Sequence, residues 1–162
     1  YSNDLLEACI QDARKKKKKG LCILSSVKKK EFLSDPKYLK HKGFMVADEA
    51  LNGITLMYLP LEERVKAPSF KPCAKLGTIE KKGFVIYYTD QCPFTYYWVP
   101  RVVSVAKEYG IEVKSVHVTD KETAQAMPVP VTNYALFRDG RYITHGIQSD
   151  KKFLKLAGIK VE

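Results

Sequence analysis

Cys92 is the residue of this sequence whose type and position most directly suggest chemistry. It lies in "IYYTDQCPFT" (86–95), after an extended apolar run and just before Pro93 and a predicted helix. Unpaired N–H groups and the positive dipole at a helix start favour a thiolate, which attacks a disulfide or holds a glutathione. Thr95 occupies the place of the second thiol in a Cys-x-x-Cys pair and is positioned to hydrogen-bond the thiolate. Alternatively, Cys92 is a small residue that fills a turn.

The remaining cysteines and the histidines indicate no metal site. Their spacing completes no zinc-binding pattern, and the residues concerned are Cys9, Cys22, Cys73, His41, His117 and His145. We therefore predict no metal, free thiols and a reducing, cytoplasmic setting. His117 is most simply a sheet residue, whereas His145 is placed to reach the region of Cys92.

The charge of the chain is concentrated at one end. The net charge of the 162 residues is +10, and residues 1–42 contribute +7, with twelve Lys/Arg and five Asp/Glu. The lysine runs "ARKKKKKG" and "VKKKEF" have three interpretations: a solvated surface, attraction of coenzyme A phosphates, or binding of nucleic acid. No aromatic residues interleave the runs, which argues against nucleic acid. No apolar run approaches the ~18 residues of a membrane span, so we expect no membrane partner.

The hydrophobic pattern places the following elements along the chain. In residues 1–61 we predict a helix at 3–19 ended by Gly20, a strand at 21–26, a broken helix up to Gly43, and strands at 44–50 and 54–61 joined by an Asn52-Gly53 hairpin. Residues 62–82 form a predicted linker. Beyond it we predict strands at 84–88, 112–118, 133–137 and 141–145, with helices at 94–109 and 149–158.

The second half resembles the thioredoxin fold over roughly residues 83–158. Cys92 follows the first strand, and Pro100 lies eight residues further on, where thioredoxins have a helix-kinking proline. "MPVPVTN" precedes a strand-turn-strand, "ALFRDGRYI", as the cis-proline segment of that family does. The resemblance implies that Pro128 or Pro130 is cis.

The first half resembles the C-terminal part of a GNAT-family N-acetyltransferase. "YSNDLLEACIQDARKKKKKG" is similar to the helix whose amino end holds the pyrophosphate of acetyl-CoA, and "LCILSS" to the strand that splays to admit the pantetheine arm. The resemblance implies cofactor contacts by Ser2, Asn3, Ser25 and Ser26. "YLKHKGFMV" resembles the family's aromatic-x-x-x-x-Gly-Phe ending, which implies Tyr38 as the general acid for the CoA thiolate. A plain core or surface role for Tyr38 is the alternative.

The two halves together resemble the YoaP-type acetyltransferases, in which such domains are fused. We predict an α/β protein with a partial GNAT acyltransferase fold at 1–61, a linker at 62–82 and a thioredoxin-like domain at 83–162. The resemblance implies acetyl transfer from acetyl-CoA to a small-molecule or peptide amine. Because the chain begins at Tyr1, we expect a preceding segment with the glycine-rich loop. The alternatives are a single-cysteine redox or glutathione-binding module centred on Cys92, or a non-catalytic partner-binding module.

Overall fold

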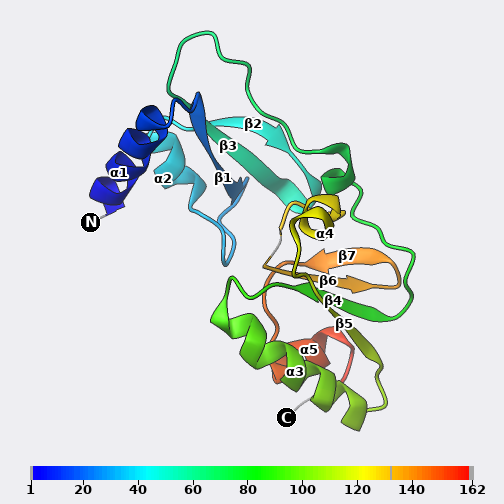
Figure 1. The fold of residues 1–162 in the computed structure, drawn as a ribbon. Coiled ribbons are helices and arrows are strands. Elements are labelled where there is room, and N and C mark those ends of the chain that lie inside the picture. The colour runs from blue at the N-terminus through cyan, green and yellow to red at the C-terminus, as the bar shows by residue number, and fades with distance from the viewer. Residues whose placement is uncertain (1, 132, 161–162) are drawn as a thin grey trace. The chain divides into compact units, whose positions relative to one another are not determined.

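The fold is mixed α/β with two separate sheets (Figure 1). The computed structural model describes residues 2–131 and 133–160. The chain divides into two compact units, which we call unit 1 (Tyr1–Lys71) and unit 2 (Pro72–Glu162). The division lies inside the segment 62–82, of which residues 62–71 contain no helix or strand.

Unit 1 contains a three-stranded antiparallel sheet and two helices. Its elements are α1 (Ser2–Lys15), β1 (Gly20–Ser26), α2 (Pro36–His41), β2 (Met45–Glu49), a 3-10 turn (Leu51–Gly53) and β3 (Ile54–Pro60). β3 comes last in the sequence but lies between β1 and β2. Within the described residues, β1 therefore hydrogen-bonds to β3 along one edge alone.

The predicted hairpin at Asn52-Gly53 is confirmed. Asn52 and Gly53 have φ values of 56° and 67°, so both adopt the left-handed conformation. Asparagine and glycine tolerate this conformation better than other residues, and two such residues in a row match the twist of the flanking strands. The strands pair antiparallel on either side, with Glu49 opposite Thr55.

The helix α1 ends earlier than predicted, and Gly20 does not terminate it. The helix stops at Lys15, Lys17 takes a left-handed φ of 52°, and Gly20 is the first residue of β1. Consecutive lysines repel one another when a helix brings them onto neighbouring turns, which disfavours a longer helix. Gly20 instead leaves room for the ring of Tyr58 beside β1, because a Cβ at this position would overlap that ring.

The core of unit 1 lies between its helices and one face of its sheet. Met57 of β3 is fully buried and packs with Leu39 of α2 and with Phe44. Leu6 of α1 and Leu21 of β1 pack against the same cluster. Both helices therefore cover the face of the sheet that carries Met57, and this burial fixes their positions on the sheet.

Unit 2 contains a four-stranded mixed sheet. Its elements are a 3-10 turn (Pro72–Lys75), β4 (Phe84–Tyr88), α3 (Pro93–Glu108), β5 (Val113–His117), α4 (Lys121–Ala126), β6 (Tyr134–Arg138), β7 (Arg141–Thr144) and α5 (Asp150–Leu156). The strand order is β5-β4-β6-β7. β4 and β5 are parallel, whereas β6 is antiparallel to both β4 and β7.

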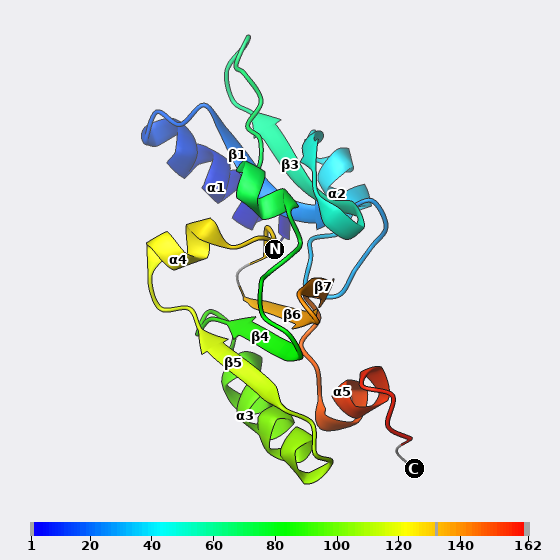
Figure 2. The same cartoon turned by 90° about the vertical axis from the view of Figure 1, so that its right-hand side faces the viewer.

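The main core of unit 2 is formed by one face of this sheet with α3 and α5 (Figure 2). Phe84 of β4 meets Phe153 of α5 edge to face, with ring centroids 5.1 Å apart. Val99 and Val102 of α3 are buried in the same cluster. The connection β4–α3–β5 brings the carboxyl ends of two parallel strands to the same edge of the sheet, where the residues after each strand meet.

Two expectations for unit 2 require correction. The six-residue helix α4 was not predicted, because "KETAQA" has no apolar stripe; its signal is Asp120, whose carboxylate accepts the backbone N–H of Thr123 at 2.7 Å. The predicted cis-proline is wrong. The described backbone has no cis peptide bond, so Pro128 and Pro130 both follow the trans bonds that most prolines prefer.

Candidate functional site

Cys92 lies at the start of α3, as the sequence predicts. It is the N-cap residue, with extended backbone angles (φ −131°, ψ 123°), and its side chain is half-buried. The sulfur makes no capping hydrogen bond. Pro93 occupies the first helical position and has no backbone N–H, so one of the donors expected to face the sulfur is missing.

Thr95 does not hydrogen-bond the sulfur, so that expectation is wrong. Its side chain is fully buried, and its hydroxyl lies 2.7 Å from the carbonyl oxygen of Thr89 and 2.6 Å from that of Cys92. A hydroxyl has one proton to donate, and both neighbours are acceptors, so the two carbonyls compete for it. Thr95 therefore holds the backbone of the loop that carries Cys92 rather than its thiol.

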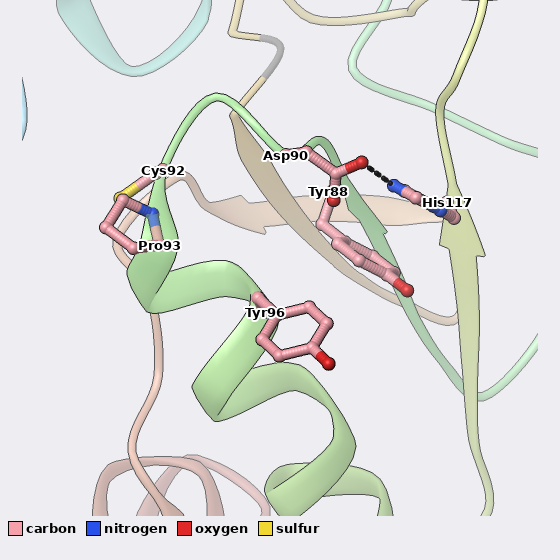
Figure 3. Close-up of a pocket in the computed structure, with 6 residues that line it drawn as sticks. All are labelled: Tyr88, Asp90, Cys92, Pro93, Tyr96 and His117. Atoms are coloured by element: carbon pink, nitrogen blue, oxygen red, sulfur yellow. Dashed lines mark ion pairs between the residues drawn. The ribbon is translucent and has the colours of Figure 1, made fainter.

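A pocket of about 520 Å³ opens beside this loop (Figure 3). It is lined by Tyr88, Asp90, Cys92, Pro93, Tyr96 and His117. The Nε2 atom of His117 lies 2.9 Å from Oδ2 of Asp90, and the imidazole stacks on the ring of Tyr88 with centroids 4.8 Å apart. In Figure 3 the sulfur of Cys92 points away from the Asp90–His117 pair. The pair therefore does not form a nucleophile–base arrangement with the thiol.

His117 and Asp90 were not predicted from the sequence as pocket residues. Asp90 follows β4 by two positions, and His117 is the last residue of β5. Because these strands are parallel neighbours, the residues at their carboxyl ends meet in the crevice where open sheets commonly bind ligands. This tendency of ligands to bind at the carboxyl ends of parallel strands could have identified both residues from the sequence. His145, in contrast, follows β7, does not line this pocket, and has its Nδ1 3.3 Å from the hydroxyl of Tyr142.

The residues predicted to contact acetyl-CoA lie at one end of unit 1. The turn at Lys16–Lys19 reverses the chain, so the amino end of α1 and the carboxyl end of β1 lie at the same end of the unit (Figure 1). Ser2 is the first residue of α1, and Asn3 beside it is exposed. This amino end is therefore not sealed by packed side chains.

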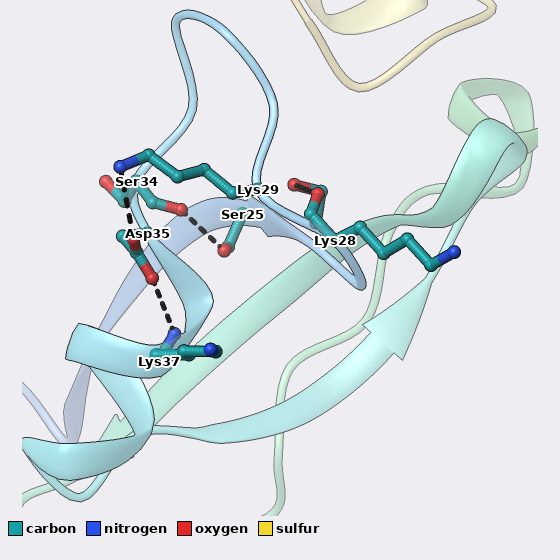
Figure 4. A network of polar contacts seen from close by, with 7 residues as sticks. Ser25, Lys28, Lys29, Ser34, Asp35 and Lys37 are labelled. Atoms are coloured by element: carbon teal, nitrogen blue, oxygen red, sulfur yellow. Dashed lines mark hydrogen bonds and ion pairs between the residues drawn. The ribbon is translucent and has the colours of Figure 1, made fainter.

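The hydroxyls of Ser25 and Ser26, at the carboxyl end of β1, form local hydrogen bonds; Figure 4 shows that of Ser25. The hydroxyl of Ser25 donates to the carbonyl of Ser34 at 2.7 Å, and that of Ser26 donates to the carbonyl of Lys28 at 2.6 Å. Both side chains are buried. Each oxygen keeps lone pairs but no second proton, so a direct contact with an anionic ligand would require these bonds to break.

Asp35 connects this end of β1 to the start of α2. Its carboxylate accepts the backbone N–H of Lys37 at 2.8 Å and forms an ion pair with Lys29 at 3.3 Å. The hydrogen bond from the Lys37 N–H, followed by the contribution of Lys29, lowers the pKa of Asp35. The charged carboxylate is thus the form that caps α2.

Tyr38 lies in the first turn of α2, close in the chain to this network. Its half-buried ring packs against the cluster of Leu39, Phe44 and Met57. The Nζ atom of Lys42 lies 5.8 Å from the centre of the ring. The side chain therefore has the core role that the sequence left open, and its proposed role as an acid stays a prediction.

The described residues contain no metal site, no membrane-spanning helix and no disulfide bond. No group of three or more His, Cys, Asp or Glu in them is placed to hold a metal ion. None of the helices in residues 2–131 and 133–160 is both long and apolar enough to cross a membrane. All four cysteines are free thiols. Partial burial raises the pKa of Cys22, so that thiol is less reactive than an open one.

Comparison with known proteins links the chain to one group. The model of the YoaP-like family matches residues 113–155. The chain is 36% identical over 156 residues to a Bacillus subtilis (strain 168) protein named "Uncharacterized N-acetyltransferase YoaP". No solved structure matches it significantly. The similarity extends over 96% of this chain, which spans 62% of the length of that relative.

Proposed function

We propose that the protein transfers an acetyl group from acetyl-CoA to an amine and that unit 1 contributes to the acetyl-CoA site. The observation that carries the proposal is the 36% identity, over nearly the whole chain, to a protein named as an N-acetyltransferase. In this proposal residues 1–61 are the C-terminal part of a GNAT domain. The acceptor is a small-molecule or peptide amine, and the four free thiols agree with a cytoplasmic protein.

The charges at one end of unit 1 support this assignment. Lys28, Lys29 and Lys30 follow β1 after Val27, at the end of the unit where α1 begins. The phosphates of acetyl-CoA are anionic, and both a helix amino end and lysine side chains attract anions. The longer run, Lys15–Lys19, lies at the opposite end and is exposed throughout. The two runs therefore have separate roles, and the longer one is a solvated surface.

The reaction is a direct displacement at the thioester. The amine nitrogen forms a bond to the acetyl carbonyl carbon, and the carbon–sulfur bond of acetyl-CoA breaks. The amine loses its proton to a water or a carboxylate, and the CoA thiolate takes up a proton. We assign that proton to the hydroxyl of Tyr38, on the basis of its place before Gly43 and Phe44.

A binding and a turnover experiment on the full-length gene product test the proposal. Acetyl-CoA should raise the melting temperature, since a ligand that binds the folded state alone stabilises it. A panel of amines should then release free CoA thiol, detected with a thiol reagent. Tyr38→Phe should lower kcat while leaving the thermal shift intact. Absence of both the shift and the thiol release would refute the acetyltransferase assignment.

We infer a second candidate function for unit 2, a thioredoxin-like single-thiol module. The supporting observation is that Cys92 caps the 16-residue helix α3 directly after β4, in a sheet with the order β5-β4-β6-β7. A thiol in this position could form a mixed disulfide with glutathione, releasing one glutathione thiol from the oxidised dimer. Mass spectrometry after oxidised glutathione treatment tests this. Modification of Cys92 no faster than that of the exposed Cys9 would exclude it.

A further inference from the structure

We propose that the pocket beside the β4–α3 loop binds an organic ammonium group. The cation would lie against the rings of Tyr88 and Tyr96, with its charge facing the carboxylate of Asp90. This site goes beyond the acetyltransferase proposal, because it belongs to unit 2 alone and its occupation requires no acetyl-CoA.

The size and walls of the pocket suit a small molecule. Its volume of about 520 Å³ falls in the range of small-ligand sites. Tyr96, in the first turn of α3, lines the pocket and is 77% exposed. Large aromatic side chains left in contact with water beside a hollow commonly mark a binding surface. In Figure 3 the rings of Tyr88 and Tyr96 lie on the same side of the loop as Asp90.

The charge of the pocket selects a cation. The protein carries a net charge of +10, yet none of the six described residues that line this pocket is Lys or Arg. Asp90 supplies the carboxylate, and its side chain is 68% exposed. Its Oδ2 atom pairs with His117, which leaves Oδ1 to accept a hydrogen bond from an ammonium group. A carboxylate ligand would meet the like charge of Asp90 and is disfavoured.

The aromatic rings add a second attraction for a cation. The face of an aromatic ring is electron-rich and attracts an ammonium group that lies over it. The ring of Tyr88 stacks on His117 with an interplanar angle of 9°, so this contact fixes the orientation of a ring that lines the pocket. A carbon skeleton attached to the ammonium group would then be shielded from water by Tyr96 and Pro93, which line the same pocket.

Three probes of similar shape separate the effect of ligand charge on binding from the effect of ligand shape. Benzylamine, benzyl alcohol and benzoate share an aromatic ring but are cationic, neutral and anionic. Each is titrated into the ¹⁵N-labelled chain without acetyl-CoA, and amide shifts are followed by NMR. We expect benzylamine to shift the amides around Asp90, Tyr96 and His117 saturably. Benzyl alcohol should bind at least about fivefold more weakly, and benzoate weaker still.

Matched variants test the assigned residues. Asp90→Asn and Tyr96→Ala should each weaken benzylamine binding about fivefold, because each removes one attraction. The controls are Glu112→Gln, an exposed carboxylate on unit 2, and Tyr109→Ala, an exposed tyrosine at the other end of α3; both should bind as the parent does. Tyr96 is exposed, so its replacement does not endanger folding. Equal binding of benzylamine and benzyl alcohol, or unchanged binding by Asp90→Asn and Tyr96→Ala, would overturn the proposal.

Discussion

The hydroxyl of Thr95 lies 2.7 Å from the carbonyl oxygen of Thr89, across the loop that carries Cys92. Thr95 is fully buried and stands where a second cysteine would complete a Cys-x-x-Cys pair. A thiol is a weak donor and could not replace the hydroxyl in this contact with equal strength. The residue thus contributes to loop structure, which explains how the loop keeps its form without a second thiol.

Replacing Thr95 by valine should destabilise unit 2. The substitution keeps the shape of the side chain but leaves the buried carbonyl of Thr89 without this donor, whereas the carbonyl of Cys92 keeps the backbone N–H of Thr95 at 3.1 Å. We expect a loss of about 1–2 kcal/mol in the free energy of unfolding, measured by urea denaturation. The control is Thr119→Val, at an exposed position in the β5–α4 loop. Equal stability of the two variants would show that the hydroxyl bond of Thr95 contributes nothing.

Replacing Gly20 by alanine should destabilise unit 1 through Tyr58. An added Cβ would lie 2.6 Å from the Tyr58 hydroxyl, whose hydrogen bond to the carbonyl of Lys19 measures 3.1 Å. The ring must move or the strand must bend, at a cost of about 1–3 kcal/mol in unfolding free energy.

A double-mutant cycle shows whether the ring is the cause of this cost. With Tyr58→Leu already in place, the Gly20→Ala substitution should cost clearly less than in the parent. Gly146→Ala is the control for the loss of a glycine, because its Cβ would meet its nearest neighbour, Thr144 Oγ1, at an ordinary 3.4 Å. A Gly20→Ala cost that is the same with and without Tyr58 would contradict the steric explanation.

Acid should weaken the caps of two short helices. The backbone N–H groups of Lys37 and Thr123 lower the pKa values of Asp35 and Asp120, respectively. A carboxyl group with a lowered pKa in the folded state stabilises the protein above the ordinary Asp range, and this contribution is lost as the pH falls from that range through the lowered pKa. Asp35→Asn and Asp120→Asn should therefore lower the melting temperature at about pH 7, and their difference from the parent should narrow below about pH 4.

The exposed Glu112 supplies the control for this pH dependence. Glu112→Gln removes a carboxylate whose side chain is 80% exposed and lies 3.7 Å from Lys114. Its effect on the melting temperature should be small at every pH, because exposed ion pairs contribute little. A deficit of the Asp35→Asn and Asp120→Asn variants that stays constant down to the lowest pH would show that charge does not act at these caps.

Elements with strong local signals were predictable from the sequence. The strand 84–88 and the helix from Pro93 have an apolar run, a proline at the first helical position and buried valines at helical spacing. The Asn52-Gly53 turn is likewise predictable, because asparagine and glycine favour the left-handed backbone that the turn requires. In each case the deciding interactions lie within a few residues along the chain, so a pattern records them.

The remaining features depend on contacts between distant residues. The need for a glycine at position 20 comes from Tyr58, 38 residues further on, and no local pattern records that contact. The pocket at Asp90 exists because β5 returns parallel to β4 and brings His117 to the same edge. Asp90 and His117 therefore looked like ordinary loop and strand positions until the strand order was known.

Charge reversal at the end of unit 1 where α1 begins should weaken the use of acetyl-CoA. If Lys28 and Lys30 attract the CoA phosphates, the double substitution Lys28→Glu, Lys30→Glu should raise the KM for acetyl-CoA about tenfold, with little change in kcat. The effect should shrink at about 0.5 M salt, because salt screens exposed charges. Steady-state kinetics of the full-length gene product measure both parameters.

The other lysine run supplies a control of identical charge. Lys18→Glu, Lys19→Glu changes the net charge by the same amount at exposed positions, but at the opposite end of unit 1. If local attraction operates, this variant should keep the KM of the parent. If overall charge alone matters, the two variants should have equal KM values, because long-range attraction depends on the summed charge of the protein. That second outcome would remove Lys28 and Lys30 from the proposed cofactor site. It would not decide the acetyltransferase proposal, which the thermal shift and the release of CoA thiol test separately.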